Sequence, residues 1–417
     1  MTKITDLRGF AALSARNFRL YFFGQCCALT GSWMQRVALV WLVMILTESG
    51  AKMGMVDFLN QAPAFFIGIF VGSFLDRHDL RWVLIGTQVC MIVHSIVLAV
   101  LVYTGTVTYE AVLFLSFLLG LVSAVDMPAR QASVSQMIDH PSQLQSALSL
   151  QSSSFNLARL FGPAVAGLII KFSGELACFV ANAVAHLAVL YAYVIMVLPP
   201  RKKSTTVNIM DSLREGLGYV WKVTPIRLCI LFNYVFCFLA IPHMVLLPIF
   251  VRNSMGGDSS HYGYMLAGIG LGALCGAMFI AFRVSVVKLP SHIWHMQTLF
   301  GVSLLVFSLV TNWAVALLLT PVVGFSLVSS LVSNNSLVQA LVDEDKRGRV
   351  LSYYSMGILG FGPIGSLVAG KLADHTTAQI TIGLCAVACL LLGLAHSLRQ
   401  KTYDATVPPI AERKGLI

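Results

Sequence analysis

Long apolar runs alternate with short polar stretches along the whole chain. Most runs reach about 20 residues, the length that an α-helix needs to cross a hydrocarbon core about 30 Å thick. Helices are the expected conformation, because lipid offers no hydrogen-bond partner to the backbone of an open strand. The runs lie at roughly 18–47, 53–75, 82–103, 109–127, 144–170, 175–198, 227–251, 262–283, 291–310, 313–340, 349–371 and 377–397.

The twelve runs form two groups of six, separated by a polar stretch. They predict an all-α membrane protein with twelve transmembrane helices in two six-helix bundles. Within the polar stretch, apolar positions from Ile209 to Trp221 recur at helical spacing, which favours an amphipathic helix on the membrane face, although a solvated linker fits equally well. The predicted parts are an N-terminal bundle (1–198), a cytoplasmic central loop (199–226), a C-terminal bundle (227–398) and a cytoplasmic tail (399–417).

The two halves of the chain resemble each other. The stretch "RQASVSQMID" (130–139) matches "NNSLVQALVD" (334–343), and "FGPAVAGLI" (161–169) matches "FGPIGSLVAG" (361–370). The matches keep the same order, which indicates that six spans were duplicated in the same orientation. Transporters built from such parallel repeats bind substrate between the halves, near the middle of the bilayer.

Composition and charge support a membrane protein and argue against other classes. The chain is 57% hydrophobic and only 11% charged, with a mean hydropathy of +0.80, whereas soluble domains carry about 25% charged residues. The net charge of +10 would be compatible with nucleic acid. However, with an inside N-terminus, 22 of the 28 Lys and Arg residues fall on one side of the membrane and four on the other. This asymmetry places both termini in the cytoplasm and leaves no need for a nucleic-acid partner.

The sequence offers little for enzymatic chemistry. The nine Cys residues lie mostly in apolar runs without a C-x-x-C pair, so neither a metal site nor a disulfide framework is expected. No Walker, H-E-x-x-H or suitably placed G-x-S-x-G motif occurs. We therefore expect no catalytic residues, no cofactor and no ATP hydrolysis.

The stretch "GSFLDRHDLR" (72–81) follows the second span. It resembles the loop 2–3 signature of the major facilitator superfamily. The resemblance implies a conformational-switch loop, in which Gly72 permits close helix contact and Asp76, Arg77 and Arg81 form a charge network that holds one conformation. Leu80 departs from the pattern, because relatives often have a basic residue there.

"RLFGPAVAG" in the fifth span resembles the Gly-Pro signature of exporters in this superfamily. Longer stretches, such as 17–50, 126–138 and 341–370, resemble the branch that contains the enterobactin exporter and macrolide-efflux proteins. The resemblance covers about residues 16–398 and implies the major facilitator fold, alternating access and export. Helix kinks are expected at Gly162, Pro163, Gly362 and Pro363.

Two arginines lie inside predicted spans, where a charge costs about 2.5–3.5 kcal/mol on insertion scales. They are Arg36 and Arg159. Such groups usually face a cavity or a partner, so both could hold an anionic substrate. Alternatively, each could be locked to a structural carboxylate such as Asp126 or Asp57. Polar residues complete the predicted cavity. Gln25, Ser32 and Asn156 lie on the same spans as these cations, and Asn60 and Gln61 form a polar face of the second span that could meet substrate or could instead cap helices at the outer mouth.

Two acids are candidates for proton coupling. Asp57 shares a face of the second span with Asn60 and Gln61, and Asp126 lies four residues before Arg130, which also favours a local ion pair. His94, His186 and His243 lie within spans and could titrate, although a membrane histidine is more often a packing residue.

These features together predict a monomeric secondary transporter of the bacterial inner membrane. We expect proton-coupled export of a small anionic metabolite, such as a carboxylate siderophore. A multidrug or macrolide efflux pump is one alternative and a lipid flippase is another.

Overall fold

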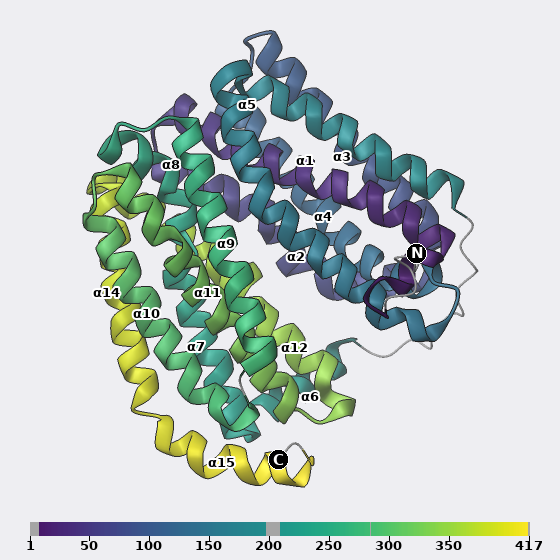
Figure 1. Cartoon of the computed structure of the whole chain (residues 1–417), viewed down its shortest axis with the longest axis vertical. Helices are drawn as coiled ribbons and strands as arrows, with labels where there is room; N and C mark the ends of the chain where they lie inside the picture. The colour runs from purple at the N-terminus through teal and green to yellow at the C-terminus, as the bar shows by residue number, and fades with distance from the viewer. Residues whose placement is uncertain (1–7, 197–208, 284, 416–417) are drawn as a thin grey trace, which may run out of the picture. The chain divides into compact units, whose positions relative to one another are not determined.

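The computed structural model describes residues 8–196, 209–283 and 285–415, and every secondary-structure element in them is helical. Figure 1 shows the arrangement of the helices within each part of the chain. Residues 199–208 of the predicted central loop lie outside the described residues. The long helices are α1 (Arg16–Thr47), α2 (Gly50–Arg77), α3 (Leu80–Tyr103), α4 (Tyr109–Met137), α5 (Leu144–Ile195), α7 (Thr224–Ala240), α8 (Pro242–Met255), α9 (Ser259–Arg283), α10 (Leu289–Leu309), α11 (Trp313–Leu341), α12 (Arg347–Met356), α13 (Gly362–His375) and α14 (Ala378–Ser397).

The described helices are consistent with the twelve predicted spans. Ten of the described helices or helix pairs are long and apolar enough to cross a membrane. Helix α2 bends by 64°, and counting it as one span gives eleven. Helix α5 has 52 residues, so it would be about 78 Å long if straight, far more than one bilayer requires. It breaks at Gly174, whose φ of 74° suits a residue without a Cβ, and its two halves serve as two spans.

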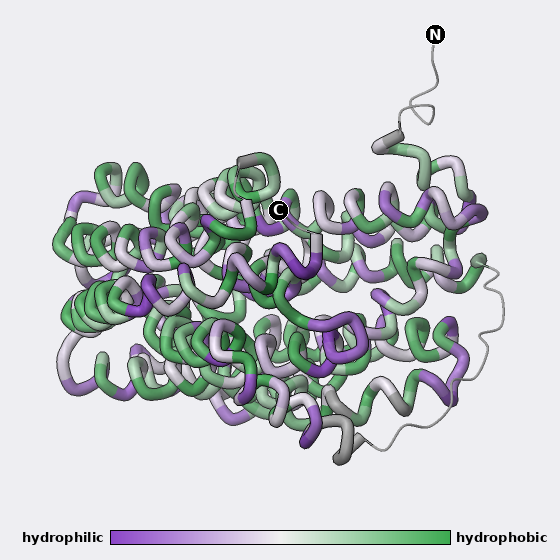
Figure 2. Tube along the Cα trace, turned by 90° about the horizontal axis from the view of Figure 1, so that it is seen from below, coloured by the Kyte–Doolittle hydropathy of each residue, from purple (hydrophilic) through white to green (hydrophobic). Residues whose placement is uncertain are grey.

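Large apolar side chains remain exposed on the helix surfaces. They include Phe172 and Leu398, with exposed fractions of 80% and 82%. Figure 2 shows hydrophobic residues along most of the helical trace. Because a soluble protein rarely leaves such continuous apolar surface open, these faces are suited to contact with lipid.

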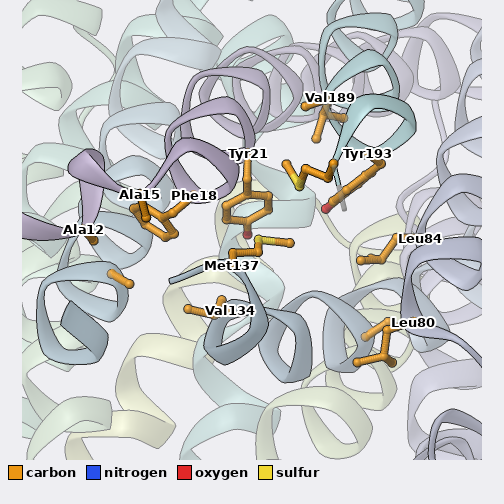
Figure 3. Packing of buried hydrophobic residues seen from close by; sticks show 14 of the residues in the cluster. Ala12, Ala15, Phe18, Tyr21, Leu80, Leu84, Val134, Met137, Val189 and Tyr193 are labelled. Atoms are coloured by element: carbon orange, nitrogen blue, oxygen red, sulfur yellow. The ribbon is translucent and has the colours of Figure 1, made fainter. Parts of the chain in front are cut away.

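The contacts divide the chain into two compact units. Unit 1 comprises Met1–Leu46, Ala62–Thr206 and Ser259–Ala267, and unit 2 comprises the remainder: Thr47–Gln61, Val207–Asp258 and Gly268–Ile417. In unit 1, Tyr21 and Tyr193 lie in a buried core with Met137 (Figure 3), and their ring centroids are 6.2 Å apart.

Each unit includes a short segment from the other half of the sequence. In unit 2, the first turns of α2 pack on α13, and a Cβ added at Gly54 would lie 2.5 Å from the Ser366 carbonyl oxygen. The carboxylate of Asp374 caps α2, since it accepts hydrogen bonds from the Ser49 hydroxyl (2.6 Å) and the Gly50 N–H (2.5 Å). In unit 1, the start of α9 packs on α5, where a Cβ added at Gly167 would lie 2.7 Å from the Ser259 carbonyl oxygen.

The internal repeat is visible in matching hydrogen bonds. Arg19, near the start of α1, donates from Nη1 to the carbonyl oxygen of Leu13 at 3.2 Å. Arg227, near the start of α7, donates from Nη1 to the carbonyl oxygen of Trp221, also at 3.2 Å. Each arginine therefore ties the first span of its half to the segment six residues earlier.

Several helices extend beyond the apolar runs. Helix α4 continues beyond the apolar run to Met137 and includes Arg130, because Ala129 and Val134 are buried in the core of unit 1. The central stretch contains α6 (Ile209–Lys222), and the tail contains α15 (Gln400–Arg413).

The two Gly-Pro pairs differ in local geometry. Helix α5 keeps helical dihedral angles through Gly162 and Pro163, so a kink there stays a prediction. In the second half, a π-helical segment (Gly357–Phe361) ends where α13 begins at Gly362, with Pro363 in its first turn. Proline is suited to this position because its missing N–H would be unpaired there anyway.

Helix α6 is held to α12 by an acidic side chain. Glu215 pairs through one oxygen with Lys346 Nζ and through the other with Arg349 Nη1. The hydrogen bond from Lys346, aided by Arg349, lowers the pKa of Glu215 from its ordinary value of 4.5. Because the pKa of Glu215 is lowered in the folded protein, the two ion pairs contribute fully to stability when the pH is above the ordinary pKa. This contribution is lost as the pH falls through the lowered pKa of Glu215.

We therefore expect the α6–α12 contact to loosen at acid pH. Spin labels at positions 218 and 348, where a Cβ would meet no atom within 4 Å, should report a narrow distance distribution at pH 7. The distribution should broaden as the pH falls below about 4.5, since protonation of Glu215 removes both ion pairs. Glu215→Gln should give the broad distribution at both pH values, and a narrow one would contradict the assignment.

Candidate functional site

Helices α1 and α5 cross closely at Gly162. A Cβ added at this glycine would lie 2.6 Å from the Cβ of Trp33 and 3.4 Å from the carbonyl oxygen of Thr30. Only a residue without a side chain fits such an approach. On the next turns, Arg36 follows Trp33 in α1, and Arg159 precedes Gly162 in α5. Contacts between Tyr21 and Gln151 and between Trp33 and Gly162 show that the two helices run in the same direction, so the two predicted cations lie on opposite sides of the crossing.

The two guanidinium groups carry like charges and interact electrostatically. The Cζ atom of Arg36 lies 5.6 Å from the centre of the Trp33 ring, in a cation–π contact. Arg159 is half-buried, and within the described residues it forms neither an ion pair nor a hydrogen bond. A cation in this setting gains most from an anion that comes from outside the chain.

The other predicted cavity residues fall in two groups. In unit 1, Gln25 is buried, Ser32 is half-buried, and Asn156 donates its amide N–H to the Ser152 carbonyl oxygen at 2.9 Å. Asn60 and Gln61 belong to the segment of α2 that lies in unit 2, as does Asp57, whose Oδ1 accepts a hydrogen bond from Gln61 Nε2 at 3.1 Å. Their contact with substrate stays a prediction.

Asp126 is bound locally. Its Oδ2 lies 2.7 Å from Arg130 Nε, which confirms the predicted ion pair, although this N–H is not aligned for a hydrogen bond. Its Oδ1 accepts hydrogen bonds from Thr87 Oγ1 (2.8 Å) and Gln88 Nε2 (2.9 Å). Asp126 is therefore not the partner of Arg159, and the alternative in which it neutralises that cation is wrong.

A profile described as transmembrane secretion effector matches residues 7–409. The chain belongs to this family. As a secretion effector of the major facilitator superfamily, it is a multi-span membrane transporter.

Curated relatives of the secretion effector have transport functions. It is 25% identical to the staphyloferrin A transporter of Staphylococcus aureus, over 85% of this chain and 89% of the relative. It is also 25% identical to the multidrug efflux pump Tap of Mycolicibacterium fortuitum, over 90% and 93%. Macrolide efflux protein A of Streptococcus pyogenes is 21% identical, over 86% and 91%.

Solved structures support the same fold. The nucleoside transporter NupG matches with a TM-score of 0.72 and 15% identity, over 93% of this chain and 98% of that one. A bacterial homologue of the human lysosomal transporter Spinster matches with a TM-score of 0.69 and 13% identity, over 95% and 96%. At this identity the likeness establishes the major facilitator fold alone.

The switch-loop signature of the secretion effector lies at the junction of α2 and α3. Arg77 is exposed and Asp76 is half-buried. Arg81 donates to the carbonyl oxygens of Tyr193 and Val194, where its charge complements the C-terminal end of α5. A Cβ added at Gly72 would meet no described atom within 4 Å, so its predicted helix contact is not made in this structure. The switching role of the loop stays a prediction.

Two polar residues of α3 were not predicted to belong to the site. Gln88 and Ser95 are both buried, and they lie seven residues apart on one face of an apolar helix. Ser95 donates a hydrogen bond to Gln35 Oε1 at 2.7 Å, and Gln88 connects Asp126 to His186. The spacing of polar residues within the run was a signal that could have revealed this face.

Proposed function

We propose that the secretion effector exports a small anionic metabolite by proton-coupled alternating access, and that Arg36 and Arg159 bind the anion. A carboxylate siderophore fits this chemistry. The transporter acts as a monomer in the bacterial inner membrane with both termini in the cytoplasm, in keeping with the distribution of Lys and Arg.

The proposal is supported mainly by the surroundings of the Arg159 side chain. This guanidinium lies near the middle of the first half of α5, without an ion-pair or hydrogen-bond partner among the described residues. Guanidinium presents a planar fork of N–H donors that matches a carboxylate in a bidentate pair. A bound carboxylate would offset both the burial of this charge and its repulsion by Arg36.

The relatives support export and are compatible with this cargo. One relative is named as a transporter of the siderophore staphyloferrin A. Proton coupling is proposed from the acidic and histidine side chains inside the bundle, with Asp57 and the cluster around Asp126 as candidates. No nucleotide-binding motif is present to supply energy from ATP.

Efflux of amphipathic drugs is a second candidate, favoured by aromatic side chains beside the cations. The rings of Trp33 and Phe155 form an edge-to-face pair with centroids 6.0 Å apart. Such rings bind apolar drug surfaces. Two relatives are named as multidrug or macrolide pumps.

The test measures uptake into inside-out membrane vesicles with an acid interior. We expect labelled staphyloferrin A to accumulate, and we expect the accumulation to stop when an ionophore collapses the pH gradient. A labelled macrolide serves as the competing probe. Accumulation of the macrolide alone would overturn the anionic cargo, and accumulation insensitive to the gradient would overturn proton coupling.

A further inference from the structure

A chain of hydrogen bonds connects α4 to α1 through the interior of unit 1. Gln88 donates from Nε2 to Asp126 Oδ1 at 2.9 Å, and its Oε1 lies 2.7 Å from Nδ1 of His186. The other ring nitrogen, Nε2, lies 3.1 Å from the hydroxyl of Ser32. The exposed fractions of Asp126, Gln88 and His186 are only 1%, 2% and 4%.

The chemistry of these groups fixes the tautomer of His186. An ionised carboxylate only accepts hydrogen bonds, so Gln88 must direct its amide N–H₂ toward Asp126 and its carbonyl oxygen toward His186. A carbonyl oxygen also only accepts, so Nδ1 of His186 must carry a hydrogen. Nε2 is therefore the nitrogen that gains or loses a proton.

The hydroxyl of Ser32 distinguishes the two protonation states. It donates a hydrogen bond to the carbonyl oxygen of Ala28 at 2.8 Å and has only one hydrogen to give. When Nε2 is unprotonated, the Ser32 hydroxyl can donate its hydrogen to the Ala28 carbonyl oxygen or to His186 Nε2, but not to both. When Nε2 is protonated, it donates to Ser32 Oγ, and both contacts are made together.

We propose that Nε2 of His186 carries the coupling proton, with Gln88 and Asp126 as positioning residues. This inference rests on the proposed proton-coupled function and selects His186 from the cluster around Asp126. Proton binding completes the hydrogen bond from α5 to Ser32, one helical turn before Arg36. Proton occupancy thereby tightens the contact between α1 and the second half of α5.

The charged and titratable groups around His186 come from the helices packed against it. Helix α4 contributes Asp126 and Arg130, which both interact electrostatically with His186. Helix α3 contributes His94, which interacts electrostatically with His186. Helix α1 contributes the neutral hydroxyl of Ser32.

The duplicated half supplies an internal control. His396 Nδ1 lies 2.8 Å from Gln297 Oε1, which repeats the Gln88–His186 pair. However, the buried amide nitrogen of Gln297 has no hydrogen-bond partner in the described parts of the chain, and Nε2 of His396 lies 3.2 Å from the hydroxyl of Tyr403. The carboxylate that positions the glutamine is thus particular to the first half.

The first test reads the tautomer directly and does not depend on any cargo. Full-length protein labelled with ¹⁵N-histidine is studied by NMR in lipid nanodiscs, with the signal assigned by its loss in His186→Gln. We expect neutral His186 to carry its hydrogen on Nδ1 and to shift toward Nε2–H in Gln88→Leu. An Nε2–H tautomer in the wild type, or a signal that never titrates between pH 5 and 8, would overturn the proposal.

The second test compares transport by His186→Gln with that by His94→Gln and His396→Gln, in vesicles with and without a pH gradient. Glutamine can bond to both neighbours of His186 but cannot take a proton. We expect His186→Gln to retain downhill movement of staphyloferrin A. Its gradient-driven accumulation should fall at least tenfold, whereas both control variants should retain this accumulation. Equal losses in all three variants would overturn the assignment to His186. If the wild type moves no staphyloferrin A, the proposed cargo fails, and the NMR result still decides the role of His186.

Discussion

Replacing Arg159 with methionine is expected to weaken transport of anionic cargo strongly while leaving the protein at least as stable as the wild type. Hydrogen bonds to a charged group contribute about 1.5–3 kcal/mol, so cargo affinity should fall about 10- to 100-fold. Within the described residues, Arg159 has no ion-pair partner that its loss would leave unsatisfied, and its charge repels that of Arg36. Removal of this half-buried charge should therefore not weaken the fold.

The measurement pairs vesicle transport with an SDS unfolding titration in mixed micelles. Arg252→Met is a matched control, because it removes an exposed arginine of α8 in unit 2. The control should retain transport. A parallel loss of transport and unfolding free energy in Arg159→Met would instead assign Arg159 a structural role.

Replacing Gly162 with leucine is expected to lower the free energy of unfolding more than any other variant proposed for this protein. The new Cβ would lie 2.6 Å from the Cβ of Trp33, closer than carbon atoms approach, so α1 and α5 must separate. Overpacking of this kind typically destabilises a protein by about 1–3 kcal/mol. Separation would also move Trp33 and the adjoining Arg36 away from Arg159, so anion transport should fall with stability.

Gly86→Ala in α3 is the control, since a Cβ there would meet no described atom within 4 Å. It should leave the free energy of unfolding unchanged or raise it, because alanine favours helices more than glycine does. Unfolding titrations and tryptophan fluorescence would measure both variants. Wild-type stability and fluorescence in Gly162→Leu would show that the helices do not cross as closely as described.

The spans were predictable from sequence because lipid restricts the backbone to helices, and the length of each apolar run follows the bilayer thickness. The sequence predicts a break between the fifth and sixth apolar runs, but it does not identify Gly174 as the residue that makes it. The φ of 74° at Gly174 is a backbone angle that many glycines could adopt. The extension of α4 to Met137 was not predicted, because polar residues after position 127 interrupt the apolar run while Val134 and Met137 still pack in the core.

The candidate site was predictable only in part. A cation in an apolar run is conspicuous, so Arg36 and Arg159 could be identified directly. Which carboxylate neutralises which cation depends on contacts distant in sequence, and the structure pairs Asp126 with Arg130. The Gln88–His186 hydrogen bond joins residues 98 positions apart, so no local pattern could reveal it.

If two guanidinium groups hold an anionic cargo, transport must depend on the charge of that cargo. Uptake of staphyloferrin A and of its methyl ester is measured with the wild type and with the Arg36→Gln, Arg159→Gln double variant. We expect the wild type to transport the acid at least tenfold better than the ester, and we expect the double variant to lose this preference. Equal transport of acid and ester by the wild type would contradict it.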